Sequence, residues 1–427
     1  MKLEHQLSLI IVIVFLVFII FNKSPRRFYI LFVIYFLPLM DLPISPPNWG
    51  SLKVFEAISY ISLFLNLGDF KSYKKTHKIY HILFGLLLLV LFLGSLNSEF
   101  ISNSLVNILS VFPIFIYSKS IINECNSDNE FPKKVIQGLK LVASISIIFL
   151  IIQIIVGLEF TFYSELNRNT LNNDSIRYPS FFPDPQKYQQ FLAMLSFLFL
   201  INDKQIGQPY FKNYLLFIIV FIAMLATGSR AAMLGFLSGI LLIFFALGLR
   251  SRFTIFIISI MVGSLFISSF DSLLILKRSE TFNDDYEFRT SLWAEAYNIY
   301  KDHPLLGIGI GNYQNFSFTR SNNYYISEEG DVIYYDSESG YLKMLSETGS
   351  LGFIISFLFI IIPIFYSVKN IFNGNKNLIV HVFLASILSW LVSFVSLYSL
   401  YDRRILILVI TFVCLLITST NFRIKHV

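Results

Sequence analysis

The sequence predicts an all-α protein: a polytopic bundle of about 12 to 13 transmembrane helices, with a large extracytoplasmic loop that contains short amphipathic helices. Of the 427 residues, 55% are hydrophobic and 14% are charged, and the mean hydropathy is +0.66. An ordinary soluble domain has about 25% charged residues, so a soluble enzyme is excluded. Continuous apolar runs recur along the chain, and about 20 apolar residues cross a bilayer as a helix. A transmembrane β-barrel would instead show weak alternating segments of about 10 residues.

The apolar runs divide the chain into three parts. Residues 1–274 carry the first ten predicted spans, residues 275–349 form the large loop, and residues 350–427 carry the last three spans. The first run has no small-residue cleavage site and precedes basic residues, so we expect it to be retained as a span. The predicted spans are 7–22, 28–40, 52–67, 80–95, 101–118, 135–157, 188–202, 213–226, 230–248, 254–274, 350–368, 378–399 and 405–420.

Alternate connections between the spans differ sharply in charge, which predicts their sides of the membrane. One set holds 18 Lys and Arg against five Asp and Glu, and an excess of Lys and Arg marks the cytoplasmic side. The N-terminus then lies outside, the C-terminus lies inside, and the long connections 158–187 and 275–349 lie outside. Residues 275–340 hold 11 acids and five bases. The net charge of +6 is therefore the sum of a basic cytoplasmic side and a more acidic outer side. It does not indicate nucleic-acid binding.

Two neighbouring arginines depart from this charge pattern. Arg403 and Arg404 fall on the predicted outer side, so either the last hairpin is misassigned or these arginines meet an anionic ligand. Ionisable residues are otherwise almost absent from the middle of the predicted spans. Ion-coupled carriers usually need such residues, so their scarcity argues against ion-coupled transport.

The sequence predicts no metal and no cofactor. Cys125 and Cys414 lie in different kinds of segment, and the six histidines show no ligand spacing. The alternation of Gly307, Gly309 and Gly311 follows no strand and opens no βαβ unit, so nucleotide binding is not expected. We expect these glycines to give a compact return of the loop toward the membrane surface.

The first candidate motif is Thr227-Gly228-Ser229-Arg230, a polar break between two spans. Gly228 permits a tight turn, Ser229 can cap the next helix, and Arg230 stands in its first turn. An arginine at the positive end of a helix is unfavourable by itself. The combination is explained by a bound anion, because backbone N–H groups and a guanidinium both bind phosphate; a simple alternative is that Arg230 extends to lipid headgroups.

The second motif begins in a predicted amphipathic helix and ends in a glycine-rich loop. Helical spacing places Arg289 and the aromatic residue Trp293 on one face, together with Ala296, Tyr297 and Tyr300. We expect the helix to end before Pro304.

The third motif extends from Asp336 to Gly352. Glu338 lies one turn before Leu342, so we expect it at the upstream end of an interfacial helix, where a carboxylate can accept a proton from a hydroxyl nucleophile. Asp336 is the second candidate for this general base. The simpler alternative for Glu338 is an acid favoured by the helix dipole.

Other candidate residues flank these motifs on the predicted outer side. Tyrosines can stack on sugar rings, although tyrosines at a membrane interface are more often ordinary anchors. Arg177, in the connection 158–187, is a candidate for lining the route of an acceptor; the simpler alternative is that its Pro-bearing segment makes the loop rigid. The tyrosines are Tyr324, Tyr325, Tyr334 and Tyr335.

In this order, the three motifs resemble the O-antigen ligase and polymerase superfamily of bacterial envelope glycosyltransferases. The family pattern is T-G-S/T-R, then an Arg four residues before a Trp that leads into D-H-P-x-x-G-x-G, then Y-L-x-x-L-x-E-x-G. All three parts occur within about residues 222 to 352. The family's ligases carry a His where this chain has Glu338, and Gly340 or Ser339 replaces the usual Asn.

The resemblance implies a saccharide on undecaprenyl diphosphate as the substrate, presented at the outer leaflet of the bacterial cytoplasmic membrane. Arg230 and Arg289 match the family's diphosphate-contacting arginines, and arginine can stabilise a diphosphate leaving group without a metal. The glutamate at position 338 suits a polymerase with a carboxylate base. We therefore expect a metal-independent, inverting polymerase of O-antigen, capsular or exopolysaccharide repeat units. Its expected partners are the lipid-linked oligosaccharide, membrane lipid and a chain-length regulator, with no nucleic acid.

Two alternatives stay open from the sequence. The first is a ligase that transfers a finished glycan from undecaprenyl diphosphate to lipid A core or to protein. The second is a transporter of lipid-linked oligosaccharides. Loss of a polymerase leaves single repeat units attached to their acceptor, whereas loss of a ligase leaves none attached. A transporter would still move its substrate into vesicles after substitution of Arg230 and Glu338.

Overall fold

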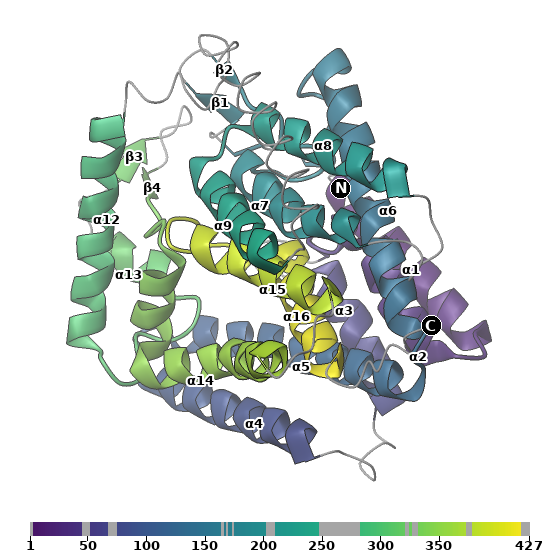
Figure 1. Cartoon of the computed structure of the whole chain (residues 1–427). Coiled ribbons are helices and arrows are strands. Elements are labelled where there is room, and N and C mark those ends of the chain that lie inside the picture. The colour runs from purple at the N-terminus through teal and green to yellow at the C-terminus, as the bar shows by residue number, and fades with distance from the viewer. Residues whose placement is uncertain are drawn as a thin grey trace.

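The computed structural model describes residues 3–44, 52–66, 75–163, 166–167, 170–172, 175–201, 210–246, 282–320, 324–326, 332–372 and 378–419. The predicted span 254–274 and the boundary at residue 274 lie outside these residues. The described chain is mainly helical (Figure 1). Its α-helices are α1 (Leu3–Phe21), α2 (Pro25–Tyr35), α3 (Val54–Ile61), α4 (Lys75–Leu96), α5 (Ile101–Ser127), α6 (Phe131–Val156), α7 (Pro185–Ser196), α8 (Tyr210–Thr227), α9 (Arg230–Ala246), α12 (Phe282–Asp302), α13 (Tyr313–Arg320), α14 (Gly340–Phe372), α15 (Leu378–Ser393) and α16 (Arg403–Ser419).

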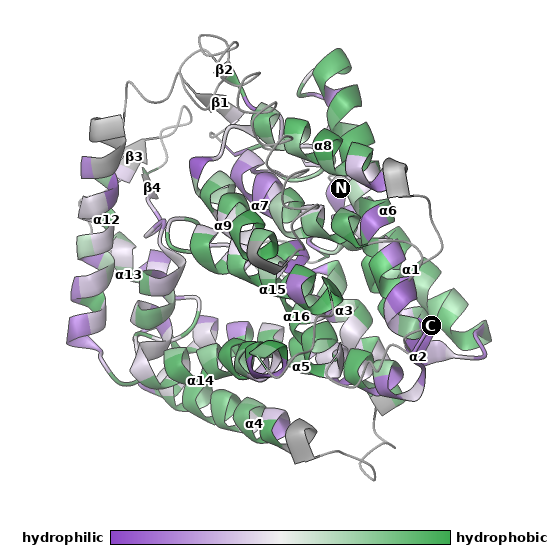
Figure 2. Ribbon diagram, in the orientation of Figure 1, coloured by the Kyte–Doolittle hydropathy of each residue, from purple (hydrophilic) through white to green (hydrophobic). Residues whose placement is uncertain are grey.

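The prediction of a helical membrane protein is confirmed by the length and composition of the helices. Among the described residues, five helices are long and apolar enough to cross a membrane: α1, α4, α5, α6 and α14. Shorter apolar helices occupy other predicted spans, including 213–226, 230–248 and 378–399. In Figure 2 the hydrophobic colouring covers α4, α14 and α15, whereas α12 carries many hydrophilic residues.

Several predicted span boundaries differ from the structure. The predicted span 28–40 becomes the 11-residue helix α2 and a 3₁₀ turn that contains Pro38, because proline cannot donate a hydrogen bond to a continuing helix. In contrast, α5 and α6 reach 27 and 26 residues, more than the roughly 20 that a bilayer needs. Their extra turns lie where the predicted cytoplasmic loop joins them.

The structure also contains two short β-hairpins, which the all-α prediction did not include. Strand β1 (Leu171–Asn172) pairs with β2 (Ser175–Ile176), and β3 (Tyr324–Ile326) pairs with β4 (Val332–Tyr334), both antiparallel. In the second hairpin Tyr324 is opposite Tyr334. Strands of two or three residues leave too short an alternation of polar and apolar residues to be recognised in a sequence.

Helices α7, α9 and α15 form the centre of the bundle (Figure 1). A Cβ atom on Gly235 of α9 would lie 2.2 Å from the Ser389 carbonyl oxygen of α15, and one on Gly239 would lie 2.9 Å from that of Ala385. Small residues spaced four apart let two helix backbones approach closely, which is a common way for membrane helices to associate. The two glycines therefore explain the close packing of α9 against α15.

Contacts between connections join segments that the charge pattern assigns to the same side. At one end of the bundle, Arg27 binds Glu124 at 2.7 Å and Asp128 at 2.9 Å; all three lie in predicted cytoplasmic connections. At the other end, Arg404 lies 3.4 Å from Asp41, and both lie in predicted outer connections. The alternation of sides agrees with these contacts, while the assignment of either end to the cell exterior stays a prediction.

Arg403 and Arg404 are buried in a network of the chain's own charges. Arg404 binds Asp402 at 2.6 Å and lies 3.4 Å from Asp41, and Arg403 forms an ion pair with Glu56. The anions that these arginines meet in the structure are therefore carboxylates of this protein. The guanidinium of Arg404 also lies over the ring of Phe182, 3.9 Å from its centroid.

Candidate active site

Helix α12 positions Arg289 and Trp293 and ends before Pro304, as the sequence predicts. Its fully buried residues are Leu292, Ala296 and Ile299, which share one face at helical spacing. Tyr297 is 46% exposed, so it does not share the buried face of Leu292, Ala296 and Ile299. The indole nitrogen of Trp293 is buried and has no hydrogen-bond partner among the described residues.

The loop after α12 closes against the first turns of α14. Gly307, Gly309 and Gly311 all have positive φ angles, of 69°, 95° and 81°, a conformation that glycine adopts without steric cost. The N–H groups of Ile308 and Gly309 donate to the carbonyls of Ser346 and Glu347 at 2.9 and 3.0 Å. These contacts confirm the predicted compact return of the loop.

Asn312 fixes the same loop to the connection between α4 and α5 and to the first turn of α5. Its side-chain amide donates to the hydroxyls of Ser98 and Ser104 at 2.6 and 2.7 Å, and its oxygen accepts from Asn103 at 2.7 Å. Because Asn312 is fully buried, these bonds satisfy polar groups that would otherwise be costly to bury. The glycine loop is therefore held from two sides.

Glu338 and Arg289, two predicted site residues from different motifs, form an ion pair. The Nη2 atom of Arg289 lies 3.1 Å from Oε2 of Glu338, and both side chains are partly exposed, at 24% and 28%. Helix α14 begins at Gly340, so Glu338 lies two residues before the helix, at its upstream end. Its φ angle is +50°, a left-handed conformation that is unusual for a residue with a side chain.

Asp336, the second candidate base, pairs with a buried lysine that sequence reasoning missed. The Lys343 ammonium lies 2.5 Å from Asp336 and faces the rings of Tyr398 and Tyr401 at 4.4 and 5.1 Å. One turn after Lys343, Glu347 is also buried and accepts a hydrogen bond of 2.7 Å from the Tyr401 hydroxyl. The four-residue spacing of Lys343 and Glu347 was a visible signal, whereas the tyrosines lie outside the three motifs.

Two phenols beside this cluster stay protonated. Burial, and then the negative charges of nearby carboxylates, raise the pKa of the Tyr313 and Tyr401 hydroxyls above the ordinary value. A neutral phenol can donate a hydrogen bond, as Tyr401 does to Glu347.

The turn before α9 is ordered by Gln189, another residue that sequence reasoning missed. Gly228 has a φ angle of +66°, and Arg230 is the first residue of α9, as predicted. The side-chain oxygen of Gln189 accepts from the Thr227 hydroxyl at 2.6 Å and from the Ser229 N–H. Gln189 lies within a predicted span, 40 residues before Ser229, so nothing in the sequence linked the two.

Arg177 lies behind the same turn. It is fully buried, and its Nε atom donates to the Thr227 carbonyl at 2.8 Å. The structure therefore places Arg177 in contact with the first motif, where it supports the turn.

The four candidate tyrosines lie in and after the hairpin of β3 and β4. Tyr324 is 50% exposed and packs on Tyr334, with ring centroids 5.8 Å apart. Tyr335 packs edge-on against Phe288, the neighbour of Arg289, at 4.7 Å. Tyr325 lies in β3. The hairpin thus brings aromatic rings beside α12.

The described residues contain no group of three or more His, Cys, Asp or Glu that could hold a metal ion. The chemistry that the site offers comes from a guanidinium, carboxylates, phenols and backbone N–H groups. Such a set can bind an anion and accept a proton from a hydroxyl.

Comparison with known proteins identifies one family. Residues 215–357 match the family model described as O-antigen ligase. This segment includes Arg230, Arg289, Asp336, Glu338 and the glycine loop. No curated protein matches the chain.

Proposed function

Because residues 215–357 carry a domain of the O-antigen ligase and polymerase superfamily, we propose that this membrane protein polymerises oligosaccharide repeat units linked to undecaprenyl diphosphate. The reaction takes place at the outer leaflet of the bacterial cytoplasmic membrane, in the extracytoplasmic loop 275–349. The products are O-antigen, capsular or exopolysaccharide chains. The observation that carries the proposal is the ion pair between Arg289 and Glu338, since it joins an anion-binding group to a carboxylate base.

In the proposed reaction, a hydroxyl of one lipid-linked repeat unit attacks the anomeric carbon of the reducing-end sugar on another. The new C–O bond forms as the bond from that carbon to the diphosphate breaks, with inversion at the carbon. Glu338 takes the hydroxyl proton. Undecaprenyl diphosphate leaves with the bonding electron pair, and Arg230 and Arg289 stabilise its charge.

The geometry of Arg289 allows both of its proposed contacts. A guanidinium carries five N–H donors in a planar fork. Arg289 meets Glu338 through Nη2, and a fork of five donors can engage a phosphate oxygen at the same time. Arg289 would thereby place the leaving group beside the base, and the indole N–H of Trp293, one turn further along α12, provides another donor.

The acceptor side of the proposed site is aromatic. Tyr324, Tyr325, Tyr334 and Tyr335 would stack on sugar rings of the repeat unit. Arg177 would act through the Thr227 turn, which it supports. A chain-length regulator would bind elsewhere on the protein.

The second candidate function is a ligase that transfers a finished glycan to lipid A core or to protein. The description of the matching family model favours it. Glu338 in place of the His of the family's ligases favours the polymerase.

Surface-glycan ladder gels test the proposal. A strain that lacks the gene should carry single attached repeat units, and the wild-type gene should restore long chains. Arg289→Ala and Glu338→Gln should both fail to restore them at normal membrane levels of protein. Lys301→Ala is the matched control, because Lys301 lies on the same helix and is exposed. Complete loss of attached glycan in the deletion strain would instead establish the ligase, and unchanged chain length in Arg289→Ala would remove Arg289 from the mechanism.

A further inference from the structure

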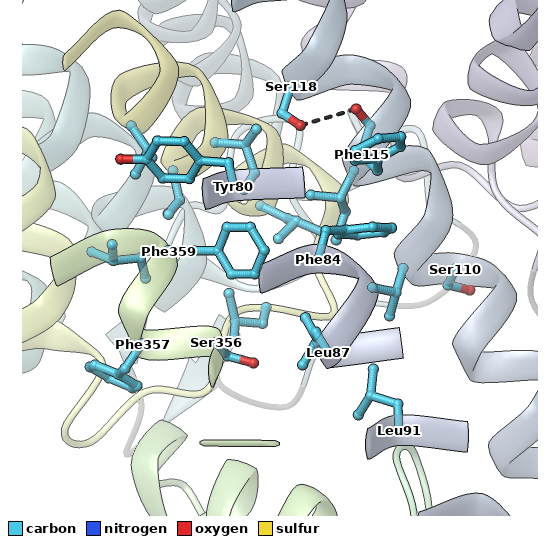
Figure 3. A pocket seen from close by; sticks show the side chains of 18 of the residues that line it. Tyr80, Phe84, Leu87, Leu91, Ser110, Phe115, Ser118, Ser356, Phe357 and Phe359 are labelled. Carbon is cyan, nitrogen blue, oxygen red and sulfur yellow. Dashed lines mark hydrogen bonds between the residues drawn. The ribbon is translucent and has the colours of Figure 1, made fainter. Parts of the chain in front are cut away.

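A pocket of about 400 Å³ lies between α2 and α6, at the end of the bundle that the charge pattern assigns to the cytoplasm. Its volume is within the range of about 300–1,000 Å³ that is common for small-ligand pockets. It shares no lining residue with the apolar cavity formed by Phe84, Phe115 and Phe359 (Figure 3). That cavity adjoins the candidate active site at Glu347 and Tyr401, so the pocket between α2 and α6 is a separate site.

Helices α2 and α6 run side by side in the same direction along this pocket. The Arg27 guanidinium lies 5.9 Å from the centroid of the Phe131 ring. Seven residues later on each helix, a Cβ atom on Gly138 would lie 2.9 Å from Ile34 and 3.4 Å from the ring of Tyr35. Helix α6 is long and apolar enough to cross the membrane. The pocket therefore extends from the start of both helices into the bilayer and closes where they meet at Gly138.

The polar end of the pocket carries two cations. Its lining there consists of Asn22, Ser24, Arg27 and Lys134, and no Asp or Glu lies among the described lining residues. Arg27 is held by two carboxylates, whereas the exposed Lys134 has no carboxylate within ion-pair distance in the part of the chain that the structure describes. Both helices also begin at this end, and helix N-termini favour negative charge. These features together favour an anion at the polar end.

Aromatic rings continue from the polar end along one face of α2. Phe28, Phe32 and Phe36 line the pocket at intervals of four residues, with centroids 5.6 Å apart in the first pair and 4.3 Å apart in the second. Phe15 of α1 supports the first two rings, at 5.8 Å from Phe28 and 5.1 Å from Phe32. A free phosphate ion would leave this apolar surface uncovered, so the occupant that fits is amphipathic.

The length of the pocket matches one leaflet of a bilayer. Its lining on α2 extends over eight residues from Arg27 to Tyr35, which is about 12 Å at 1.5 Å per residue. One leaflet of the hydrocarbon core is about 15 Å thick. Tyr35 is 42% exposed, so the pocket is open beside its apolar end, and acyl chains can continue from it into the surrounding lipid.

We infer that this pocket binds an anionic phospholipid of the cytoplasmic leaflet, with the phosphate between Arg27 and Lys134 and an acyl chain along the aromatic face of α2. Basic pockets between membrane helices at the cytoplasmic side are suited to anionic headgroups. The inference goes beyond the proposed function and does not depend on it, because no residue of the candidate active site takes part.

Native mass spectrometry of the full chain in detergent, titrated with phosphatidylglycerol or phosphatidylcholine, tests this inference. We expect tighter binding of phosphatidylglycerol, which carries the net negative charge. Lys134→Gln should weaken that binding about fivefold, because a basic residue near the membrane surface contributes about 1 kcal/mol to the attraction of anionic lipid. Binding of phosphatidylcholine should not change.

Lys133→Gln is the matched control for Lys134→Gln. It removes the same charge one residue earlier, but Lys133 pairs with Glu130 at 2.8 Å and does not line the pocket. We expect this variant to bind phosphatidylglycerol as the wild type does. Equal binding of the two lipids by the wild type, or equal losses in the two lysine variants, would overturn the inference.

Ser24 allows a second test that preserves the start of α2. It is the N-cap residue of this helix, and Asp and Asn are both good N-caps. Ser24→Asp places a negative charge at the polar end of the pocket and should also weaken phosphatidylglycerol binding about fivefold, whereas Ser24→Asn should bind as the wild type does. Unchanged binding by Ser24→Asp would show that the phosphate is not held at this end.

Photolabelling locates the occupant. The probe is phosphatidylglycerol with a photoreactive group in one acyl chain, and we expect labels on Leu31 and Tyr35 that excess unlabelled phosphatidylglycerol removes. Absence of labels from α2 would overturn the inference. Displacement of the probe by undecaprenyl phosphate at a lower concentration than by phosphatidylglycerol would assign the pocket to a polyprenyl lipid and would also overturn it. None of these measurements requires turnover, so their outcome is independent of the polymerase proposal.

Discussion

The backbone of Leu305 occupies the space in which Gly349 would carry a side chain. A Cβ atom on Gly349 would lie 2.3 Å from the Leu305 carbonyl carbon and oxygen. Gly349 has φ +62° and ψ −176°, which breaks α14 at this residue. The N–H groups of Ser350 and Leu351 then donate to the carbonyls of Pro304 and Leu305 at 2.8 and 3.2 Å. The carbonyls of the loop thus replace the carbonyls of the preceding turn that a continuous helix would have used as acceptors. The structure of the third motif therefore depends on that of the second.

Gly349→Ala should destabilise the protein by at least about 2 kcal/mol, because the conformation is nearly restricted to glycine and the new methyl group meets backbone atoms. Thermal unfolding in detergent measures this effect. Gly85→Ala is the matched control, since Gly85 lies inside α4 with no atom within 4 Å of a Cβ; alanine there should stabilise the helix by about 0.5–1 kcal/mol. Equal unfolding temperatures for Gly349→Ala and the wild type would contradict the role given to this contact.

The left-handed conformation of Glu338 predicts a difference between two inactive variants. Glu338→Gly and Glu338→Ala both remove the carboxylate and its pairing with Arg289, so both should lose chain elongation. Only glycine accepts a φ angle of +50° without steric cost. We therefore expect the glycine variant to be more stable than the alanine variant by about 1 kcal/mol, after allowing for the larger entropy of glycine in the unfolded chain. An alanine variant as stable as the glycine variant in denaturant titrations would show that the backbone carries no strain there.

The charge pair of Asp402 and Arg404 predicts how stability depends on pH. Burial opposes ionisation of Asp402, but the charge and hydrogen bond of Arg404, together with the charges of Lys187 and Lys53, outweigh burial and lower the pKa of Asp402 from 3.8 to about 2. The unfolded chain therefore takes up this proton at a higher pH than the folded protein does. The stabilisation is complete above about pH 4 and is lost as the pH falls toward 2.

Asp402→Asn tests this dependence. The variant should be less stable than the wild type at neutral pH, because Arg404 stays buried with one carboxylate fewer, and its stability should change less between pH 4 and pH 2. Thermal unfolding at both pH values, with Asp302→Asn at an exposed position as the control, measures the difference. A variant with the same acid sensitivity as the wild type would exclude Asp402 as a source of the pH dependence.

The sequence predicted the helical membrane fold, the turn at Gly228, the end of α12 before Pro304 and the close return of the glycine loop, because each depends on local properties of a few residues. It also selected Arg289 and Glu338, which the fold brings together. It could not predict that Gln189 orders the Thr227 turn, or that Lys343 lies among rings from the segment after α15, since these contacts join residues that are far apart in the chain. The sequence placed Glu338 at the upstream end of a helix, but spacing alone does not reveal that this residue adopts a left-handed conformation.

The charge network at Asp41 also bears on how the chain is made. Glu56 is synthesised 347 residues before Arg403, its partner in the folded protein. Asp41 is synthesised 362 residues before Arg403 and 363 before Arg404. During translation, Lys53 is the cation already present beside Asp41. A chain that stops before α16 would carry these buried acids without the arginines that neutralise them, and breaking a buried ion pair is strongly destabilising. Helix α16 thus completes a charge network whose acidic residues are made much earlier, and a chain without α16 would be destabilised at these buried acids.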